Sequence, residues 1–312
     1  MRTPFFKHAS LIGCSAGVGF LIGADNERFR NRLRFLSVPL IARADAATTH
    51  PPTQPPALPG ATLVPTLDGH GSKQPGPSRA SEIMRFGYPG FDNLRTFEDF
   101  VLSYDRRNRT VHWVFEHLTP DRLEYAKEVD RSKCQFTEDN SIHPYFRSMN
   151  ADYKASGYDR GHMAPAGNHR RSQNAIQQTF LLSNMAPQVG HGFNRDKWNQ
   201  LEKYIRSLAR KNPNVYICTG PLYLPRQEAD GKLYVRYQVI GKQHVAVPTH
   251  FFKVLLVESN DRTFDLECFV LPNQSIPDET PLMKFYTPLE SIERAAGLME
   301  LGHREQQHQE TK

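Results

Sequence analysis

A polar run at residues 158–171 contains side chains that could hold an anion and move a proton beside it. The run reads YDRGHMAPAGNHRR, with Arg160 and His162 on either side of one glycine. A histidine can take a proton from water near neutral pH, because its unperturbed pKa is about 6.5. The planar fork of an arginine matches two oxygens of a phosphate at once. A loop whose charges only serve solubility is the alternative interpretation of the run taken alone.

Five more polar side chains extend this chemistry downstream. They are Asn184, Gln188, Asn194, Glu202 and Arg206. Amide and carboxylate oxygens suit a hard cation such as Mg²⁺, which keeps most of its waters. Hydrolysis of a phosphodiester requires a base, positive charge on the phosphate and a cation near the departing oxygen, and the sequence offers all three.

A predicted helix carries three of these side chains. Apolar residues recur at helical spacing at Trp198, Leu201, Ile205 and Leu208. Asn194 can cap the helix, and the Asn-Pro pair at 212–213 ends it. Glu202 and Arg206 are four residues apart and share one face, although an exposed ion pair is the common meaning of that spacing. Asn194 and Glu202 lie about 12 Å apart along an ideal axis, so sharing one cation requires a water or an irregular first turn.

The segments DRGHMAPAGNHR, TFLLSNMAPQ and NRDKWNQLE together resemble the DNA/RNA non-specific metal-dependent endonucleases. DRGH alone is a weak signal, but the downstream spacing N-x-x-x-W-x-x-x-E makes the combination specific. Flanking text, including SIHPYFRSMNADYKASGYDRGH and the ending PLESIERAAGL, resembles the mitochondrial members of that family. The similarity covers roughly residues 82–300. It implies an active site built as a ββα-metal finger and cleavage of both DNA and RNA.

The resemblance implies a role for each matching residue. His162 is expected to be the general base, and Asn194 the direct ligand of one Mg²⁺ ion, for which Mn²⁺ can substitute. Glu202 is expected to act through the water shell of that ion. The other expected site residues are Arg160, Asn184 and Arg206 as catalytic groups and Asp159, Gln188 and Arg170 as substrate-binding groups. Relatives also carry an arginine some thirty residues before the histidine; here Arg131 and Lys133 both remain candidates.

Partners and location are also implied by the resemblance. A homodimer is expected, resident between the mitochondrial membranes and relocated to the nucleus in cell death. An exonuclease-like mitochondrial paralogue is the alternative within the superfamily, although its motif tends to begin with Ser where this chain has Asp159. A catalytically silent nucleic-acid-binding module is an alternative of another class.

Other basic residues and histidines have less specific interpretations. A phosphate-tracking surface or simple solubility could account for Lys154, His169, Arg170, Arg171, Lys203, Arg210 and Lys211. His143 and His250 are expected to serve structural packing.

The net charge of +6 suggests a polyanionic partner, but most of it lies at the start of the chain. Residues 1–49 contain seven Lys and Arg against three acids, a net charge of +4. Their acid-poor start and the uncharged run 9–24 predict a mitochondrial targeting and sorting segment, with transient association of 9–24 with the inner membrane. A secretory signal and a retained anchor are the alternatives, since sixteen residues are short for the ~20 that span a bilayer.

Composition predicts the remaining domain limits. Residues 50–79 are rich in Pro and Gly and predict an extended linker, residues 80–302 a nuclease domain, and residues 303–312 a polar tail. The four cysteines show no CxxC or CxxH spacing, which argues against a disulfide framework and against a structural zinc site.

The predicted fold class is α+β, a mixed but mainly antiparallel sheet. Residues 101–118 read as two strands around a turn at 105–109. Further strands are predicted at 179–184, 215–220, 233–240, 250–258 and 263–271 from their β-branched and aromatic residues. A second amphipathic helix is predicted at 290–301.

Overall fold

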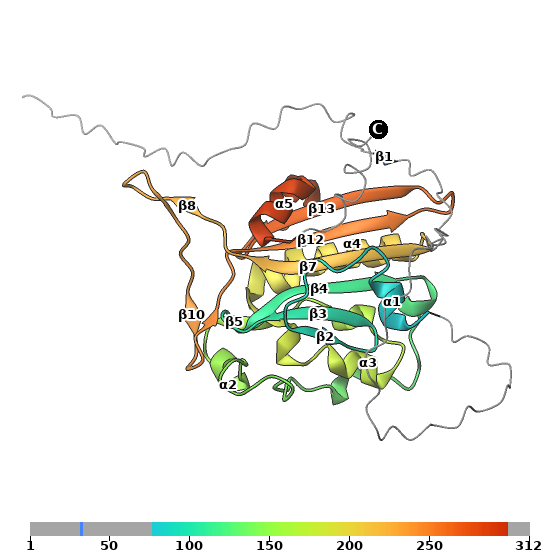
Figure 1. Ribbon diagram of the computed structural model, residues 1–312, viewed down its shortest axis with the longest axis horizontal. Coiled ribbons are helices and arrows are strands. Elements are labelled where there is room, and N and C mark those ends of the chain that lie inside the picture. Colours follow the sequence, from blue (N-terminus) through green and yellow to red (C-terminus); the bar gives the residue numbers. More distant parts are fainter. Residues whose placement is uncertain (1–31, 34–76, 299–312) are drawn as a thin grey trace, which may run out of the picture. The chain divides into compact units, whose positions relative to one another are not determined.

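A computed structural model describes residues 32–33 and 77–298 of the chain. Its main sheet has the strand order β1-β13-β12-β7-β4-β3-β2, and every pair of neighbours in it is antiparallel (Figure 1). The strands of this sheet are β1 (Arg32–Leu33), β2 (Leu94–Thr96), β3 (Phe100–Asp105), β4 (Thr110–Leu118), β7 (Asn214–Leu222), β12 (His250–Glu258) and β13 (Phe264–Pro272). The predicted mainly antiparallel α+β fold is therefore confirmed.

Three two-stranded ribbons and several helices complete the described fold. The ribbons pair β5 (Tyr158–His162) with β6 (Met185–Val189), β8 (Arg226–Gln227) with β9 (Leu233–Tyr234), and β10 (Val239–Ile240) with β11 (Val245–Ala246). The α-helices are α1 (Arg79–Ile83), α2 (Asn150–Tyr153), α3 (Gln173–Gln178), α4 (Asn199–Ala209) and α5 (Leu289–Ala296). Short 3-10 turns occur at Asp121–Leu123, Arg131–Lys133, Ala166–Asn168, Leu182–Asn184 and Leu282–Phe285. None of the helices in the described ranges is long and apolar enough to cross a membrane.

Helices cover both faces of the main sheet, which explains why its strands are apolar on both sides. One face packs against α4, whose buried Leu201 and Ile205 join Phe251 of β12 in one core. The other face packs against α1 and α5, with Ile292 of α5 joining the neighbouring Phe252 of β12. Because successive side chains of a strand point to opposite faces, Phe251 and Phe252 serve different cores. Figure 1 shows α4 behind the sheet and α5 in front of it.

Three sequence predictions about elements were wrong. Residues 179–184 were predicted as a strand, but they contain the 3-10 turn Leu182–Asn184, and the strand begins only at Met185. The predicted strand 233–240 survives only at its ends, as β9 and β10. The second predicted helix ends at Ala296, because Gly297 takes a left-handed conformation with φ 68°. In each case tertiary contacts or a chain reversal outweighed β or helical propensity.

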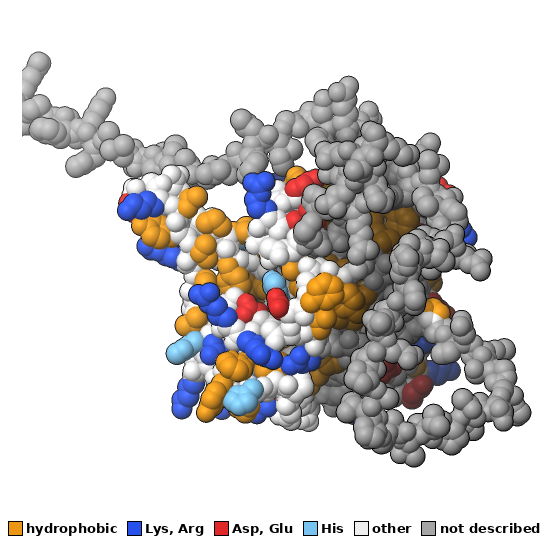
Figure 2. All heavy atoms as spheres, in the orientation of Figure 1, with side chains coloured by type: hydrophobic (Ala, Val, Ile, Leu, Met, Phe, Trp, Pro, Cys, Tyr) orange, Lys and Arg blue, Asp and Glu red, His pale blue; other side chains and the backbone are white. Residues whose placement is uncertain are grey.

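An arm formed by residues 223–240 carries β8 and β9 and exposes apolar side chains. Leu233, Val235, Tyr237 and Val239 are all more than 40% exposed. Figure 2 shows hydrophobic and basic side chains next to each other in the region of this arm. Single exposed apolar residues are common, but a row of four on one segment marks a surface suited to another protein chain.

Candidate active site

A cleft of about 600 Å³ lies along β5 and the start of α4. Seven of the nine predicted site residues line it: Asp159, Arg160, His162, Arg170, Asn194, Glu202 and Arg206. They come from β5, the loop after it, the turn before α4 and α4 itself. Residues up to 47 positions apart, Asp159 and Arg206, thus face one space.

The strands β5 and β6 and the helix α4 form the expected ββα arrangement. β5 pairs antiparallel with β6, with His162 opposite Met185 and Gly161 opposite Ala186. The side chain of Gln188 lies against Gly161: a Cβ added at Gly161 would be 2.0 Å from Gln188 Oε1. The motif therefore needs glycine at 161 because a buried glutamine occupies the space where a side chain would stand.

Asn184 and Gln188 do not line the cleft, although direct site roles were predicted for both. Asn184 is fully buried; its Oδ1 accepts from the backbone of Ala164, and its Nδ2 donates to the carbonyls of Ala164 and Thr179. It ties the chain after β5 to the chain before β6. Gln188 is also fully buried. Both side chains support the finger from behind and do not face the cleft.

Asp159 is engaged by the turn before α4. Its Oδ2 accepts from Asn194 Nδ2 at 3.0 Å, and its two oxygens accept from Arg195 at 2.8 and 2.7 Å. The hydrogen bond from Arg195 is the main cause that holds the pKa of Asp159 below its usual value. An ionised carboxylate would repel phosphate, so the geometry favours a role in orienting Asn194 over the predicted contact with substrate.

An irregular turn, Gly190–Trp198, precedes α4 and presents Asn194. His191 and Gly192 have non-helical backbone angles, and the amide of Gly192 donates to Asp196 Oδ2 at 2.6 Å. Asn194 is not the helix cap that the sequence predicted, because its side chain bonds Asp159 instead. In the described part of the chain its Oδ1 accepts no hydrogen bond. The turn before α4 is thus irregular, which is one of the two arrangements expected to let Asn194 and Glu202 share a cation.

His162 lines the cleft and packs against two aromatic rings that also contact each other. Its ring centroid lies 5.5 Å from that of Phe136 and 4.9 Å from that of Phe180. Burial, helped by the positive charge of Arg131, lowers the pKa of His162 to about 3. The imidazole is therefore neutral at pH 7. Its Nε2 is sealed from solvent and has no hydrogen-bond partner among the described residues.

Arg160 is fixed in the cleft by one polar and one aromatic contact. Its Nη1 donates to Asn150 Oδ1 at 2.7 Å, and its guanidinium lies 4.5 Å from the centroid of Phe136. Such contacts hold the planar group in one orientation.

Arg131 lines the cleft, whereas Lys133 does not. The guanidinium of Arg131 lies 5.8 Å from the ring of Phe180, beside His162. The side chain of Lys133 is 73% exposed and lies near Asp130. Of the two candidates for the upstream basic residue, the structure therefore places Arg131 in position.

Glu202 and Arg206 lie on one face of α4, as predicted, but their side chains are largely buried. Arg206 Nη1 is 3.8 Å from Glu202 Oε2, and the two side chains are only 14% and 13% exposed. Burial raises the pKa of Glu202 to about 6, although the charges of Lys253 and Arg206 oppose this. The pair is therefore part of the cleft wall and is not an exposed ion pair.

Only some of the residues suggested to form a phosphate-tracking surface lie in the cleft. Arg170 and Lys203 line the cleft, while Lys154, Arg210 and Lys211 are exposed outside its lining. Arg171 pairs with Asp121 at 2.8 Å. His169 is fully buried, so its membership in a surface that tracks phosphate was wrong.

The other histidines and the cysteines lie away from the cleft. His143 is exposed and packs edge-on against Tyr145, and His250 is partly buried, 3.0 Å from Thr249 Oγ1. Cys134, Cys218 and Cys268 are free thiols. Within the described residues there is no group of three or more His, Cys, Asp or Glu that could hold a metal.

Comparisons with known proteins agree with this geometry. The profile of the DNA/RNA non-specific endonuclease family matches residues 79–306. The mitochondrial endonuclease G of Caenorhabditis elegans is 53% identical over 91% of this chain and 89% of its own length. The human endonuclease G is 56% identical over 70% and 72%.

The chain belongs to the DNA/RNA non-specific endonuclease family. A solved structure, a crystal structure of an EndoG/EndoGI complex that describes EndoG inhibition, matches this endonuclease with a TM-score of 0.71 and 59% identity. The match covers 72% of this chain and 92% of that one. The enzyme is thus a hydrolase of nucleic acids, from a family of metal-dependent nucleases.

Sequence analysis missed several residues that shape the endonuclease site. Arg195, Asn150, Phe136 and Phe180 contact its polar side chains, and none of them was among the predicted site residues. Arg195 directly follows Asn194 in the sequence, and this adjacency was the one signal that could have pointed to Arg195. The other three are brought in only by folding.

Proposed function

We propose that this endonuclease cleaves DNA and RNA with weak sequence preference, with His162 as the general base that activates water. The observation that carries the proposal is geometric: the imidazole of His162 lines the same cleft as Arg160, Arg206 and Asn194. A neutral imidazole can accept a proton at physiological pH, whereas an imidazolium cannot.

The proton goes to Nδ1 of His162 in this scheme. Nε2 is sealed from solvent, so Nδ1 is the nitrogen open to a water in the cleft. As the water loses its proton, its oxygen attacks the phosphorus in line with the 3′ oxygen, which leaves. The rings of Phe136 and Phe180 keep the imidazole in place. Because the attacking group is water and not a 2′-hydroxyl, both DNA and RNA are substrates.

Arginines bind the phosphate and carry the selectivity for nucleic acid. Arg160 and Arg206 face the cleft, and Arg131 is the third guanidinium there. Contacts to phosphate oxygens carry no base information, so they support weak sequence preference and strong dependence on salt.

The oxygen atoms in the cleft fit one Mg²⁺ ion. Asn194 Oδ1 accepts no hydrogen bond from the described chain, and Asp159 holds its amide in that orientation. We propose that Asn194 binds the ion directly and that Glu202 acts through its water shell; Mn²⁺ can substitute. When bound, the ion supplies positive charge for the phosphorane and the leaving oxygen.

The names of the relatives and the composition of the N-terminal residues support a proposal on location, and an exposed apolar row supports one on assembly. The similar endonuclease G proteins are named mitochondrial, and residues 1–49 have the composition of a targeting segment. We place the enzyme between the mitochondrial membranes, with transient membrane contact through residues 9–24 and relocation to the nucleus in cell death. Residues 9–24 lie outside the described residues. The exposed apolar side chains at 233–239 support a homodimer.

A cleavage assay on the full chain tests the proposal. Supercoiled plasmid and RNA are incubated with Mg²⁺ or EDTA, using wild type, His162→Ala, Asn194→Ala and the control His143→Ala. We expect nicking and then linear product for wild type and the control, and loss of at least 100-fold in rate for the two cleft variants. Cleavage that requires free ends would favour the exonuclease-like paralogue, and binding without cleavage a silent binding module. Equal rates for wild type and His162→Ala would reject the assigned base.

A further inference from the structure

The guanidinium of Arg206 is held from inside the protein by a residue that does not line the cleft. Arg206 Nη1 donates to Oδ1 of Asn168 at 3.1 Å. Its distance to Glu202 Oε2 is longer, 3.8 Å. Asn168 ends the 3-10 turn Ala166–Asn168 and is only 3% exposed. Among the described residues, Asn168 is therefore the acceptor of the hydrogen bond that fixes the guanidinium of Arg206.

The amide of Asn168 can face Arg206 in only one way. Its Nδ2 donates to Oε1 of Glu116 at 2.9 Å, and Glu116 is fully buried in β4. The same carboxylate oxygen lies 2.8 Å from His169 Nε2. A carboxylate only accepts hydrogen bonds, so it turns the amide NH₂ toward itself and the amide oxygen toward Arg206.

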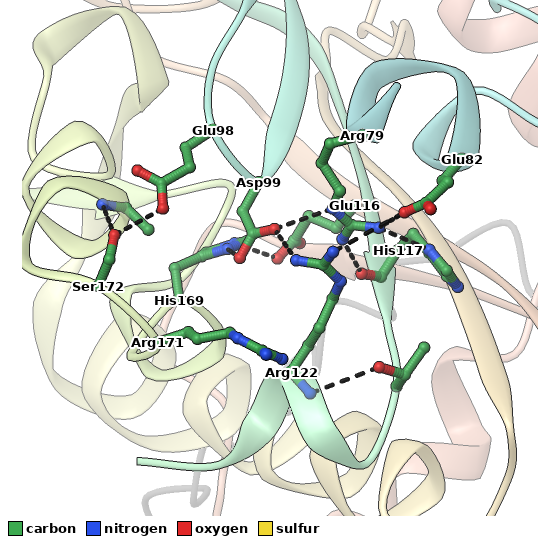
Figure 3. A network of polar contacts seen from close by, with 12 residues as sticks. Arg79, Glu82, Glu98, Asp99, Glu116, His117, Arg122, His169, Arg171 and Ser172 are labelled. Atoms are coloured by element: carbon green, nitrogen blue, oxygen red, sulfur yellow. Dashed lines mark hydrogen bonds and ion pairs between the residues drawn. The ribbon is translucent and has the colours of Figure 1, made fainter. Parts of the chain in front are cut away.

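A buried ion network keeps Glu116 in place. His169 lies between Glu116 and Asp99, with its Nδ1 3.7 Å from Asp99 Oδ2. Asp99 in turn contacts Arg79 at 2.9 Å and Arg122 at 2.7 Å. Figure 3 shows the carboxylates of Asp99 and Glu116 next to the ring of His169, and Arg79 and Arg122 beyond Asp99. Burial opposes a charge on His169, but the two carboxylates raise its pKa to about 9. The imidazolium then donates to Glu116.

We propose that Asn168 is a positioning residue for Arg206, oriented by Glu116 and His169. A long side chain without such support loses conformational freedom when it binds a phosphate, and this loss weakens binding. Because the network already holds Arg206 in one conformation, this side chain loses less conformational entropy when the substrate binds. The inference rests on the proposed role of Arg206 in binding phosphate.

A double-mutant cycle on the full chain tests it. The affinity for a labelled single-stranded DNA oligonucleotide is measured in EDTA, across a range of salt, for wild type, Asn168→Ala, Arg206→Ala and the double variant. We expect each single variant to weaken binding about 10-fold, and Arg206→Ala, which removes a positive charge, to lower the slope of log Kd against log salt by about one. The double variant should bind no more weakly than Arg206→Ala, because Asn168 acts through that arginine.

Controls separate positioning from simple loss of structure. Asn214→Ala removes bonds to His117 and Glu258 in the outer part of the same network. We expect it to lower the unfolding temperature and leave Kd unchanged. Asn168→Leu keeps the branched shape and the number of heavy atoms of the side chain and replaces the Ala variant if that one does not fold.

Every outcome of these binding measurements either supports or overturns the inference. Effects that multiply to about 100-fold in the double variant, or wild-type binding by folded Asn168→Ala, would overturn the inference. Equal weakening by Asn214→Ala would do the same. Wild-type binding by Arg206→Ala would instead reject the proposed role of Arg206 itself.

Discussion

Asp159 Oδ2 accepts a hydrogen bond from Asn194 Nδ2 at 3.0 Å, which joins the first residue of the DRGH motif to the turn before α4. The bond leaves Asn194 Oδ1 as the free oxygen of the amide. Asp159 can therefore act by orienting the amide of Asn194, without contact with substrate.

Loss of this bond should weaken metal binding and leave nucleic-acid binding intact. We expect Asp159→Ala to raise the Mg²⁺ concentration for half-maximal cleavage 10- to 100-fold, as for other supports of metal ligands. Oligonucleotide affinity in EDTA should stay within twofold of wild type. Asp121→Ala is the matched control, because Asp121 also pairs with an arginine but lies outside the cleft lining. A normal Mg²⁺ requirement in Asp159→Ala would contradict the orienting role.

Arg131 and Lys133 should differ sharply although they are two residues apart. Arg131 lines the cleft beside His162, while Lys133 points to solvent. We expect Arg131→Ala to lower kcat/KM on DNA about 10-fold or more and to reduce the salt slope of binding by about one. Lys133→Ala should match wild type in both measurements. The reverse pattern would assign the upstream role to the lysine.

Gly161 should be replaceable only if Gln188 gives way. The Cβ of an alanine would meet Oε1 of the buried glutamine at 2.0 Å. We expect Gly161→Ala to lower the free energy of unfolding by about 1–3 kcal/mol, as overpacking of a core does. Adding Gln188→Ala should recover part of that loss in denaturant titrations. Independent, additive losses in the double variant would show that the two residues do not compete for space.

The buried His169 should make stability depend on pH in the alkaline range. Its folded pKa of about 9 exceeds the ordinary value of about 6.5. The contribution of the charged His169 to the free energy of unfolding is therefore complete below pH 6.5 and is lost as the pH rises through 9. This corresponds to about 3 kcal/mol of unfolding free energy.

Denaturant titrations between pH 7 and 10 check this, with His169→Gln expected to show a flatter profile than wild type. His143→Gln, a change at an exposed histidine, should keep the wild-type profile. Parallel profiles for wild type and His169→Gln would mean that the imidazole is not charged in the folded state.

The exposed arm offers a test of assembly. Val235 is 50% exposed in the row of apolar residues at 233–239. If this row lies in a homodimer interface, Val235→Asp should bury a charge and shift the molecular mass in light scattering from dimer toward monomer. Lys242→Asp, also at an exposed position but outside the row, serves as the control. A dimer that survives Val235→Asp would place the interface elsewhere.

The sequence alone predicted most of the residues that line the cleft and most of the strands of the sheet. Histidine, arginine, amide and carboxylate side chains at the spacing of the family predicted nine site residues, and seven of them line one cleft. Alternating apolar residues beside the turn at 105–109 located β3 and β4, and β-branched and aromatic residues located β7, β12 and β13, because both signals depend on local geometry and burial.

Only the tertiary structure decided which way the remaining side chains face. Asn184, Gln188 and His169 are polar residues in or near the motif, yet all three are buried. Asn184 bonds a backbone carbonyl, His169 contacts the carboxylate of Glu116, and Gln188 packs against Gly161. Arg131 and Lys133 are equivalent in sequence, and packing beside Phe180 separates them. Such outcomes depend on contacts between residues far apart in the chain, which residue type and spacing do not encode.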